Sequence, residues 1–189
     1  MERCPWCLGT EIETRYHDQE WGTPVHDERT HFEYIILDAF QAGLSWRTIL
    51  NKRENFRRAF AEFDPAVVAG FGEMELERLM QDARIVRNKA KILAASLNAQ
   101  AFLRIQDEFG SFDGFIWRFT DGKTLHPRRF EPRDVPAKSP EAEAMSKELV
   151  RRGMKFVGPT ICYAYMQAAG MVNDHLVSCF RHKELGGTA

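Results

Sequence analysis

The chain has 189 residues, which is enough for one domain with a sizeable core, and its composition is ordinary for a globular protein. Its 26 basic and 27 acidic residues leave a net charge of -1, so any site for a polyanion must come from local patches and not from an overall field. No segment approaches the ~20 consecutive apolar residues of a membrane span, and the N-terminus lacks the apolar run of a signal peptide. We therefore expect a cytoplasmic protein with no membrane contact.

Residues 1–25 show little helical periodicity and are rich in cysteine, proline and glycine, so we expect an irregular arm that needs a staple. From Asp27 to Ala42, apolar residues recur at helical spacing, and Asp27 is a plausible N-cap. Gly43 then breaks this helix, and Ser45 is positioned to cap a second helix that runs through Phe63. Residues 41–46 are thus expected to form a tight turn between two helices.

Asp64 followed by Pro65 predicts the start of a short helix, and a second short helix is expected over 73–81. A connector over 82–91 then leads into a long helix. It carries four basic residues: Arg84, Arg87, Lys89 and Lys91. Two helices around a basic hairpin suit phosphate binding, whereas the alternative is a solvated turn before a basic helix face.

Ser111 is expected to cap an aromatic helix, and Ser139 before Pro140 to open another. Residues 120–138 form the longest loop, which we interpret as either a lid or a connector. An apolar helix is expected from Gly158 to Gly170, followed by a final helix that carries His175 and Cys179. No long strand-like alternation occurs, so we predict an all-α single unit with an arm (1–25), a helical region (26–120), a basic loop (121–138) and a second helical region (139–189).

Cysteines and histidines at the two ends of the chain suggest a metal site. His175 and Cys179 are four residues apart, which on a helix places both on one face, and Cys4, Cys7 and His17 lie in the arm. These five residues are candidates for four tetrahedral positions that would pin the arm to the last helix. The alternatives are small apolar core cysteines and a satisfied buried imidazole. Because no His-Glu-x-x-His arrangement places a general base beside the metal, we favour a structural site.

Long, ordered motifs support a more specific interpretation. They are Met1–Cys4, Tyr16–Gly22, Leu37–Trp46, Lys52–Asn55, Lys155–Tyr163 and Val172–His175. Through them the chain closely resembles the 3-methyladenine DNA glycosylase I family over nearly its whole length. The resemblance implies a helix-hairpin-helix fold and removal of 3-methyladenine from alkylated double-stranded DNA after base flipping. It also implies a structural Zn²⁺ held by Cys4, His17, His175 and Cys179, which leaves Cys7 outside the ligand set.

The same resemblance assigns roles in a base-binding site. Asp38 corresponds to the base-recognising carboxylate, Tyr16 shares its hydrogen bonding, Trp46 stacks on the extruded base, and Trp6 and Trp21 lie nearby. These roles suit the substrate, because 3-methylated adenine is cationic while attached to its sugar, so aromatic faces attract it and a carboxylate accepts from its amine. The base then departs neutral, and we expect hydrolysis by water without a lysine adduct.

Contacts with DNA are assigned to the basic connector and to the turn after Gly43. Leu44, at the tip of this turn, is a candidate wedge for the gap that a flipped base leaves, and inward packing is the alternative. We expect a monomer that acts on duplex DNA.

Three positions depart from the family pattern. Asp38 stands where glutamate is usual, Glu13 where an aromatic residue is frequent, and Arg84 and Ala90 where glycines are expected. A glycosylase of shifted substrate range therefore remains an alternative. Others are a non-catalytic protein that binds damaged DNA or bases, and a zinc hydrolase.

Overall fold

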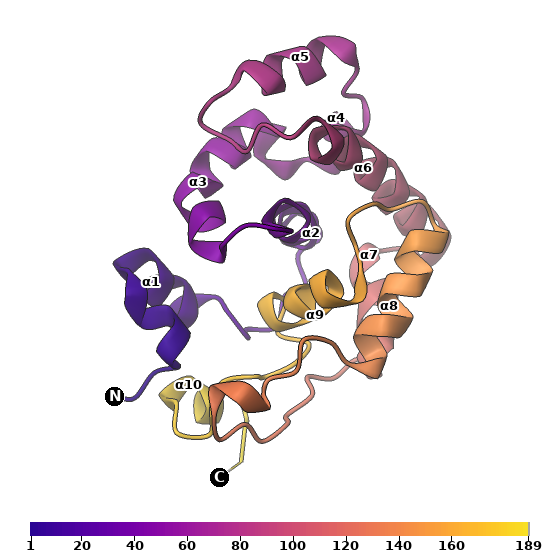
Figure 1. Ribbon diagram of the computed structural model, residues 1–189. Coiled ribbons are helices and arrows are strands. Elements are labelled where there is room, and N and C mark those ends of the chain that lie inside the picture. Colours follow the sequence, from indigo (N-terminus) through magenta and orange to yellow (C-terminus); the bar gives the residue numbers. More distant parts are fainter. Residues whose placement is uncertain (189) are drawn as a thin grey trace.

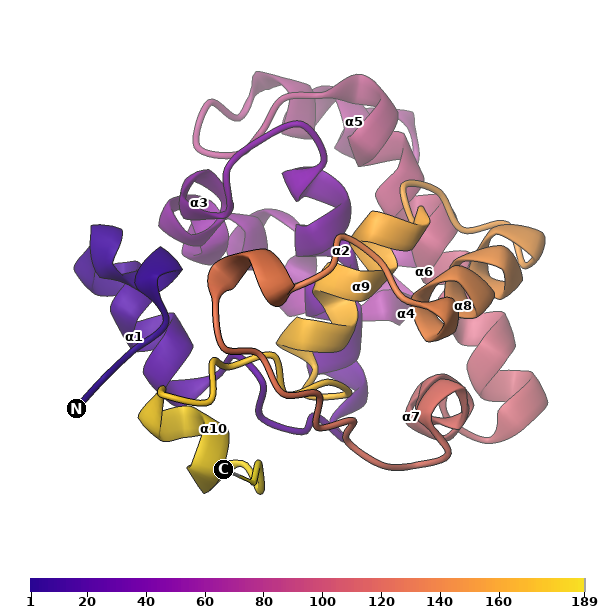
Figure 2. The same cartoon turned by 60° about the horizontal axis from the view of Figure 1, so that its bottom comes forward.

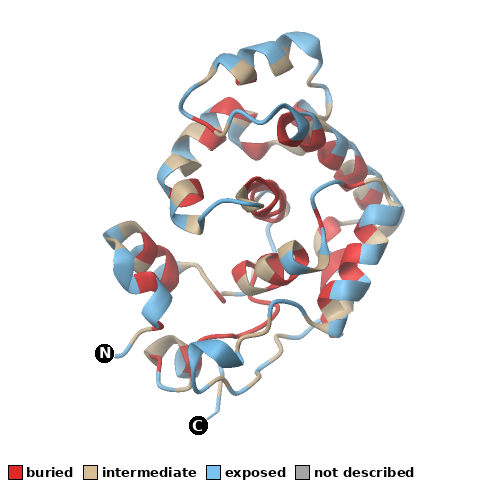
Figure 3. Cartoon of the chain, viewed as in Figure 1, coloured by how far each residue is buried: buried red, intermediate tan, exposed pale blue. Residues whose placement is uncertain are grey.

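Helix α2 (Glu28–Gln41) is the central element of the fold and is seen end-on in Figure 1. All ten residues from 31 to 40 are buried, because α3 (Trp46–Ala59), α6 (Lys89–Phe109), α7 (Phe112–Ile116) and α9 (Pro159–Ala168) pack around this helix. Figure 3 shows α2 buried on all sides. A polar residue near its C-terminal end, Asp38, is therefore carried into the interior.

The computed structural model describes residues 1–188, and within that range it contains helices, turns and one isolated bridge between Leu125 and Val172 but no strand. The all-α prediction is therefore confirmed. No helix in the described part of the chain has both the length and the apolar character needed to cross a bilayer.

Short polar side chains begin most of the helices where the sequence predicts them. Asp27, Ser45, Ser111 and Ser139 accept hydrogen bonds from backbone N–H groups at the starts of α2, α3, α7 and α8 (Pro140–Arg151). Asp64 does the same for α4 (Pro65–Ala69). Each such cap contributes about 1 kcal/mol to stability.

Two joints between consecutive helices reach the surface of the molecule. The first is the basic connector (residues 82–88) between α5 (Glu73–Gln81) and α6, and the second is the turn over 152–158 between α8 and α9. Figure 2 shows α5 and the connector at one edge of the molecule. The described residues also contain four short 3-10 segments: Pro5–Gly9, Ala61–Phe63, Trp117–Thr120 and Pro132–Asp134.

The structure differs from the sequence-based expectation at both ends of the chain. Residues 1–25 are not irregular throughout, because Glu11–Gln19 forms helix α1, which Thr10 caps and which carries two acidic residues in its first turn. The expected final helix is also wrong. Residues 169–179 form turns, and only Phe180–Glu184 forms helix α10. His175 and Cys179 therefore do not share a helix face.

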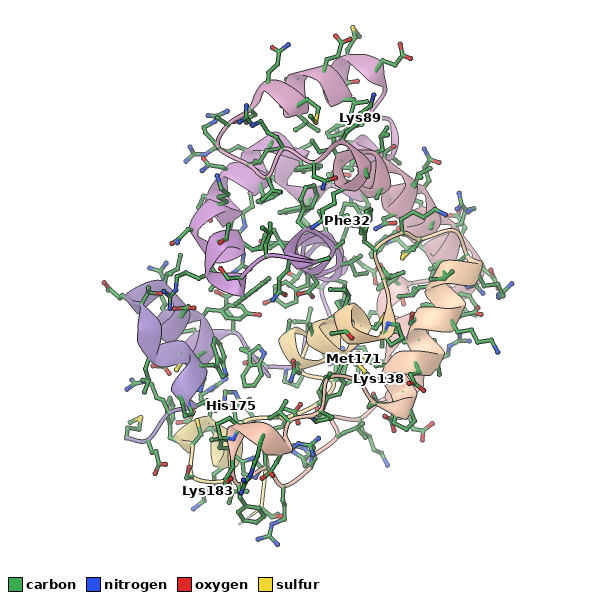
Figure 4. The ribbon with its side chains drawn as sticks, viewed as in Figure 1. Phe32, Lys89, Lys138, Met171, His175 and Lys183 are labelled. Atoms are coloured by element: carbon green, nitrogen blue, oxygen red, sulfur yellow. The ribbon has the colours of Figure 1, made fainter. Side chains whose placement is uncertain are left out.

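The core consists of one large cluster and one small one. Phe32, near the centre of Figure 4, belongs to the large cluster. The small cluster contains Cys4, Leu176 and Cys179, with Trp21 and Phe180 against it. A backbone hydrogen bond of 3.1 Å from Phe180 N to Glu2 O ties the two chain ends together beside it.

Candidate base-binding pocket and metal centre

A cavity of about 650 Å³ opens between α1, α2, α9 and the segments at the two ends of the chain. Its walls are mostly apolar and aromatic, which is typical of pockets for small aromatic ligands. The lining residues are Cys4, Pro5, Trp6, Tyr16, Trp21, Asp38, Gln41, Trp46, Pro132, Val135, Ala164, Gln167, Ala168, Asp174 and Leu176. The structure thus brings together all five residues that the sequence assigned to base recognition.

Four aromatic side chains contact one another along this cavity. The ring centroids of Tyr16 and Trp46 are 5.3 Å apart, and those of Trp6 and Trp21 are 5.1 Å apart. Trp6 lies edge-on to Tyr16 at 6.4 Å and joins the two pairs. Several π faces are thus available to a flat cationic ligand.

Asp38 places a carboxyl group in this aromatic cavity with no protein partner for one oxygen. Its side chain lines the cavity but is only 2% exposed, and its Oδ2 accepts no hydrogen bond from the described residues. Burial raises the pKa of this carboxyl well above its usual range. The Nε1 of Trp46 is also buried without an acceptor in that part of the chain. Buried polar groups are almost always paired, so these two unpaired atoms are candidates for contacts with a bound molecule.

Tyr16 separates this cavity from a smaller one of about 130 Å³ behind it. Burial raises the pKa of the Tyr16 hydroxyl, so it remains a neutral phenol that donates a hydrogen bond. Arg53 lies behind it and donates to Glu20 at 2.6 Å and to Glu33 at 2.7 Å. This ion-pair network stiffens the wall from which Tyr16 enters the cavity.

Gln167 and Asp174 line the cavity, although the sequence did not single them out as site residues. The Asp174 carboxylate accepts from Arg129 Nε at 3.0 Å, from the Tyr163 hydroxyl and from Gln167 Nε2 at 2.9 Å. Because a carboxylate only accepts, the Gln167 amide must turn its nitrogen toward Asp174. The neighbouring metal-ligand motif around His175 is the one sequence signal that pointed to this segment.

The four residues that the resemblance implies as metal ligands converge in one buried cluster. The ligand atoms of Cys4, His17, His175 and Cys179 all lie within 4.8 Å of one another. His175 Nδ1 is 3.1 Å from His17 Nε2, 3.6 Å from Cys179 Sγ and 3.7 Å from Cys4 Sγ. Tetrahedral Zn²⁺ bonds of ~2.0–2.3 Å place neighbouring ligand atoms ~3.3–3.8 Å apart, so the cluster has the dimensions of a zinc site.

The outer nitrogens of both histidines have partners that fix the ligating nitrogens. His17 Nδ1 is 2.8 Å from the Asp18 carboxylate, which Arg3 also contacts, and His175 Nε2 is 3.0 Å from Trp21 O. Metal-bound histidines usually donate their second N–H to such acceptors. The residues present therefore fit a zinc ion. The fifth candidate, Cys7, lies outside the cluster, and its thiol donates to Cys4 O.

The metal cluster and the cavity share a wall. Trp21 lies 4.5 Å from the His175 ring and Trp6 lies 5.6 Å from the His17 ring, between ring centroids. Gly22 makes the approach possible, because it has φ +79° and a Cβ there would meet His175 Nε2 at 3.0 Å. Figure 4 shows His175 between α1 and the C-terminal segment.

The residues assigned to DNA contact divide into two groups. Gly43 has φ +78° at the exposed turn between α2 and α3, where Leu44 is 41% exposed. Arg87 and Lys89 are exposed, with Lys89 at the periphery of Figure 4 near α5, and Arg84 is exposed but pairs with Asp82 at 2.9 Å.

Lys91 differs from the other basic residues of this segment. It is only 6% exposed, and it donates to the backbone carbonyls of Phe40 and Ala42. The sequence reveals its charge but not this inward direction.

The departures from the family pattern are accommodated locally. Glu13 is buried but does not line the cavity, because Arg47 pairs with it at 2.9 Å and Thr10 donates to it at 2.8 Å. Ala90 is exposed at the start of α6. Asp38 is thus the departure that lies in the cavity itself.

Comparison with known proteins agrees with this geometry. The family model described as "Methyladenine glycosylase" matches residues 6–182. The chain is 45% identical over 179 residues to DNA-3-methyladenine glycosylase 1 of Escherichia coli (strain K12), covering 95% of this chain and 96% of that protein. It is 42% identical over 177 residues to DNA-3-methyladenine glycosylase of Haemophilus influenzae, covering 94% and 96%.

A solved structure shares the fold. It is the structure of 3-methyladenine DNA glycosylase I from Staphylococcus aureus, solved to show how that protein recognises 3-methyladenine. It superposes with a TM-score of 0.92 at 34% identity and covers 95% of this chain and 96% of that one. The chain therefore belongs to the methyladenine glycosylase family.

Proposed function

We propose that this protein is a DNA-3-methyladenine glycosylase that removes the cationic alkylated base from double-stranded DNA by hydrolysis after base flipping. Its relatives are DNA-3-methyladenine glycosylases, hydrolases that act on N-glycosyl bonds. The observation that carries the proposal is the buried, partly unpaired carboxyl group of Asp38 in an aromatic cavity.

Each part of the cavity has a task in this proposal. The aromatic faces of Trp46, Trp6 and Trp21 attract the delocalised positive charge of the methylated base. Asp38, in its carboxylate form, accepts from the exocyclic amine and pairs with that charge, while the Tyr16 hydroxyl donates a hydrogen bond to the base. A normal adenine is uncharged and gains much less from this environment, which gives selectivity.

The reaction needs little acid catalysis. When the glycosidic C–N bond breaks, its electron pair neutralises the charge on the departing base. Water then adds to C1′ of the sugar and releases a proton to solvent. Among the described residues that line the cavity there is no lysine, which supports water rather than an amine as the nucleophile.

The proposed Zn²⁺ is structural. With Cys4, His17, His175 and Cys179 all coordinated, no open position remains for water or substrate. Its contribution is to crosslink the two ends of the chain. These ends form the wall that carries Trp6 and Trp21.

DNA binding is assigned to the face that carries the exposed turn and the basic connector. We assign Arg84 and Arg87 of the connector, and Lys89 at the start of α6, to phosphate contacts, and Leu44 to a wedge at the tip of the turn after Gly43. The two joints α5–connector–α6 and α8–turn–α9 are the candidates for a helix-hairpin-helix element. We further propose that residues 1–189 act as one catalytic unit and as a monomer.

The test is mass-spectrometric identification of the bases released from methylated duplex DNA. The parent is expected to release 3-methyladenine, and Asp38→Asn, which keeps the shape and removes the charge, is expected to lose at least ~100-fold in rate, as for a lost buried charge pair of about 3 kcal/mol. Asp107→Asn, on the exposed face of α6, is the matched control and should act like the parent.

Three results would contradict parts of the proposal. Binding of methylated DNA or free base without any base release would indicate the non-catalytic alternative. An enzyme–DNA adduct trapped by borohydride would show that the nucleophile is an amine of the protein and not water. Release of other alkylated purines in preference to 3-methyladenine would indicate a substrate range shifted by Asp38.

A further inference from the structure

Lys91 is a buried cation at the junction of three segments. It lies in the first turn of α6, directly after the basic connector, and its side chain turns inward. Its Nζ donates to Phe40 O at 2.9 Å and to Ala42 O. It also lies 5.9 Å from the ring centroid of Phe156, in the turn between α8 and α9.

The two carbonyls that Lys91 contacts belong to the C-terminal end of α2 and the residue that follows it. This helix ends at Gln41, and the next residue, Ala42, has φ -47° and ψ 115°, outside the helical region. Carbonyls in a final helical turn lack intrahelical partners, and they form the negative end of the helix dipole. Leu44 N donates to Gln41 O at 2.6 Å. Lys91 donates to the carbonyl before it, Phe40 O, and to the one after it, Ala42 O.

Lys91 has no carboxylate partner in residues 1–188. Two carbonyls and an aromatic face therefore provide the surroundings of its charge, and desolvation lowers the pKa of its ammonium. Burying an ammonium without a counterion lowers the stability of the fold. Packing of the two helices alone therefore does not explain a lysine at this position. An apolar residue would join them at lower cost.

The segment held by Lys91 is the one that carries the proposed wedge. Asp38 lies in the last turn of α2, Leu44 lies at the tip of the following turn, and Trp46 begins α3. Gly43, between them, has open space around it and a positive φ, so this turn has few contacts of its own. The hydrogen bonds from Lys91 fix where the turn begins.

We infer that Lys91 is a positioning residue that holds the Gln41–Ser45 turn in place for DNA, and not a phosphate ligand. This inference rests on the proposed function, because it assigns Lys91 to the step in which the damaged base leaves the duplex. Because Lys91 directly follows the basic connector in the chain, its hydrogen bonds also fix the turn relative to that connector. The wedge and the phosphate contacts are thereby kept in register.

The effect of removing Lys91 should therefore depend on the form of the substrate. A loosened turn impairs extrusion from a duplex, which needs a wedge, but it impairs single-stranded DNA less, because no stacked partner has to be displaced. Binding of free 3-methyladenine in the cavity needs no wedge. A general loss of folding would lower all three activities together.

The experiment compares Lys91→Met with Lys147→Met, an exposed lysine on α8 outside the proposed sites. For Lys91→Met, the single-turnover rate on duplex DNA should fall on the order of tenfold, as for one lost charge-assisted hydrogen bond. The rate on single-stranded DNA and the affinity for free 3-methyladenine, measured by tryptophan fluorescence, should change less than about twofold. Lys147→Met should resemble the parent, and Lys91→Arg should recover part of the duplex rate.

Two further measurements distinguish the proposed positioning role of Lys91 from phosphate binding and from a purely structural role. A lost phosphate contact lowers the slope of log K against log salt by ~0.9, whereas loss of a positioning contact leaves it unchanged. Lys91→Met in a Leu44→Ala background should add little to the duplex defect, because both changes disable the same turn. Should Lys91→Met not fold, Lys91→Gln, which keeps one donor, is compared in the same assays.

A lower salt slope, equal losses on all substrates or full additivity with Leu44→Ala would overturn the inference. These outcomes are distinct from failure of the proposed function, in which the parent protein itself releases no 3-methyladenine.

Discussion

Asp38 shows how the binding site is built at the cost of stability. A carboxyl group with one unpaired oxygen at 2% exposure disfavours the folded state until a ligand supplies the missing donor. Because aspartate is one methylene shorter than glutamate, it reaches less far into the cavity from the same backbone position. We expect the contact with the base to shift correspondingly.

Burial of Asp38 makes stability depend on pH in a defined direction. Its pKa in the folded protein is raised well above 3.8, so the unfolded chain loses this proton first, and the contribution of Asp38 to stability falls as pH rises above about 4. Asp38→Asn removes this dependence. Without ligand, the variant should be more stable than the parent at pH 7, and the difference should shrink as pH approaches 4.

Urea denaturation at several pH values between 4 and 8 measures this effect. Other carboxyl groups titrate alike in both proteins, so only the difference between the two curves matters. A difference that is constant with pH would contradict the prediction, because it would show that the pKa of Asp38 is the same in the folded and unfolded protein.

Among the elements of the fold, the loop over 121–138 has a clearer role than its sequence suggests. The structure docks it against residues 170–177 through Leu125 N to Met171 O at 2.9 Å and Val177 N to Arg129 O at 2.7 Å. It contributes Pro132 and Val135 to the cavity wall. These contacts make the loop part of the cavity wall.

Arg129 provides the test of this docking. Arg129→Met leaves the fully buried Asp174 carboxylate without its cation and should lower the free energy of unfolding by roughly 1.5–3 kcal/mol. The matched control is Arg133→Met in the same loop, which removes an exposed pair with Glu131 and should change stability by less than about 1 kcal/mol. Chemical denaturation distinguishes the two, and equal effects would contradict the docking role of Arg129.

The sequence predicts elements well where capping and periodicity agree. Asp27, Ser45 and Asp64 each have side chains whose local chemistry determines where a helix begins. The helix over 11–19 is missed because it is short and surrounded by cysteine, proline and glycine. His175 and Cys179 are correctly paired for the wrong reason, since turns rather than helical spacing bring them together.

The site is predicted only in part for a related physical reason. Resemblance identified Asp38, Tyr16 and the tryptophans, which the structure places around one cavity. It did not identify Gln167 and Asp174, which contact each other and are held in place by the nearby Tyr163 and by Arg129, 45 residues away in the sequence from Asp174. The cluster of basic residues over 82–91 likewise assigned Lys91 to DNA, because a sequence gives the charge of a side chain but not its direction.

At the scale of the whole molecule, the metal cluster joins residues 4 and 17 to residues 175 and 179. We expect the protein to contain about one zinc per chain by elemental analysis. Cys4→Ser should lose most of this metal and unfold at lower temperature, because zinc binding contributes directly to folding.

Cys7→Ser is the matched control for this prediction. Cys7 is equally buried and lies three residues away, but its thiol is outside the cluster. This variant should keep the full metal content. Equal metal loss in both variants would show that Cys7 is a ligand, and a catalytic rather than structural metal would be indicated if a folded, metal-free sample were stable but inactive.

The closeness of residues 4 and 179 also has a consequence for how the active protein is made. Because synthesis proceeds from the N-terminus, the segment that carries Trp6 and Trp21 leaves the ribosome long before the residues against which it packs. The cavity wall is therefore completed only when residue 179 has been made. A nascent chain with a finished central helix therefore still lacks a closed cavity.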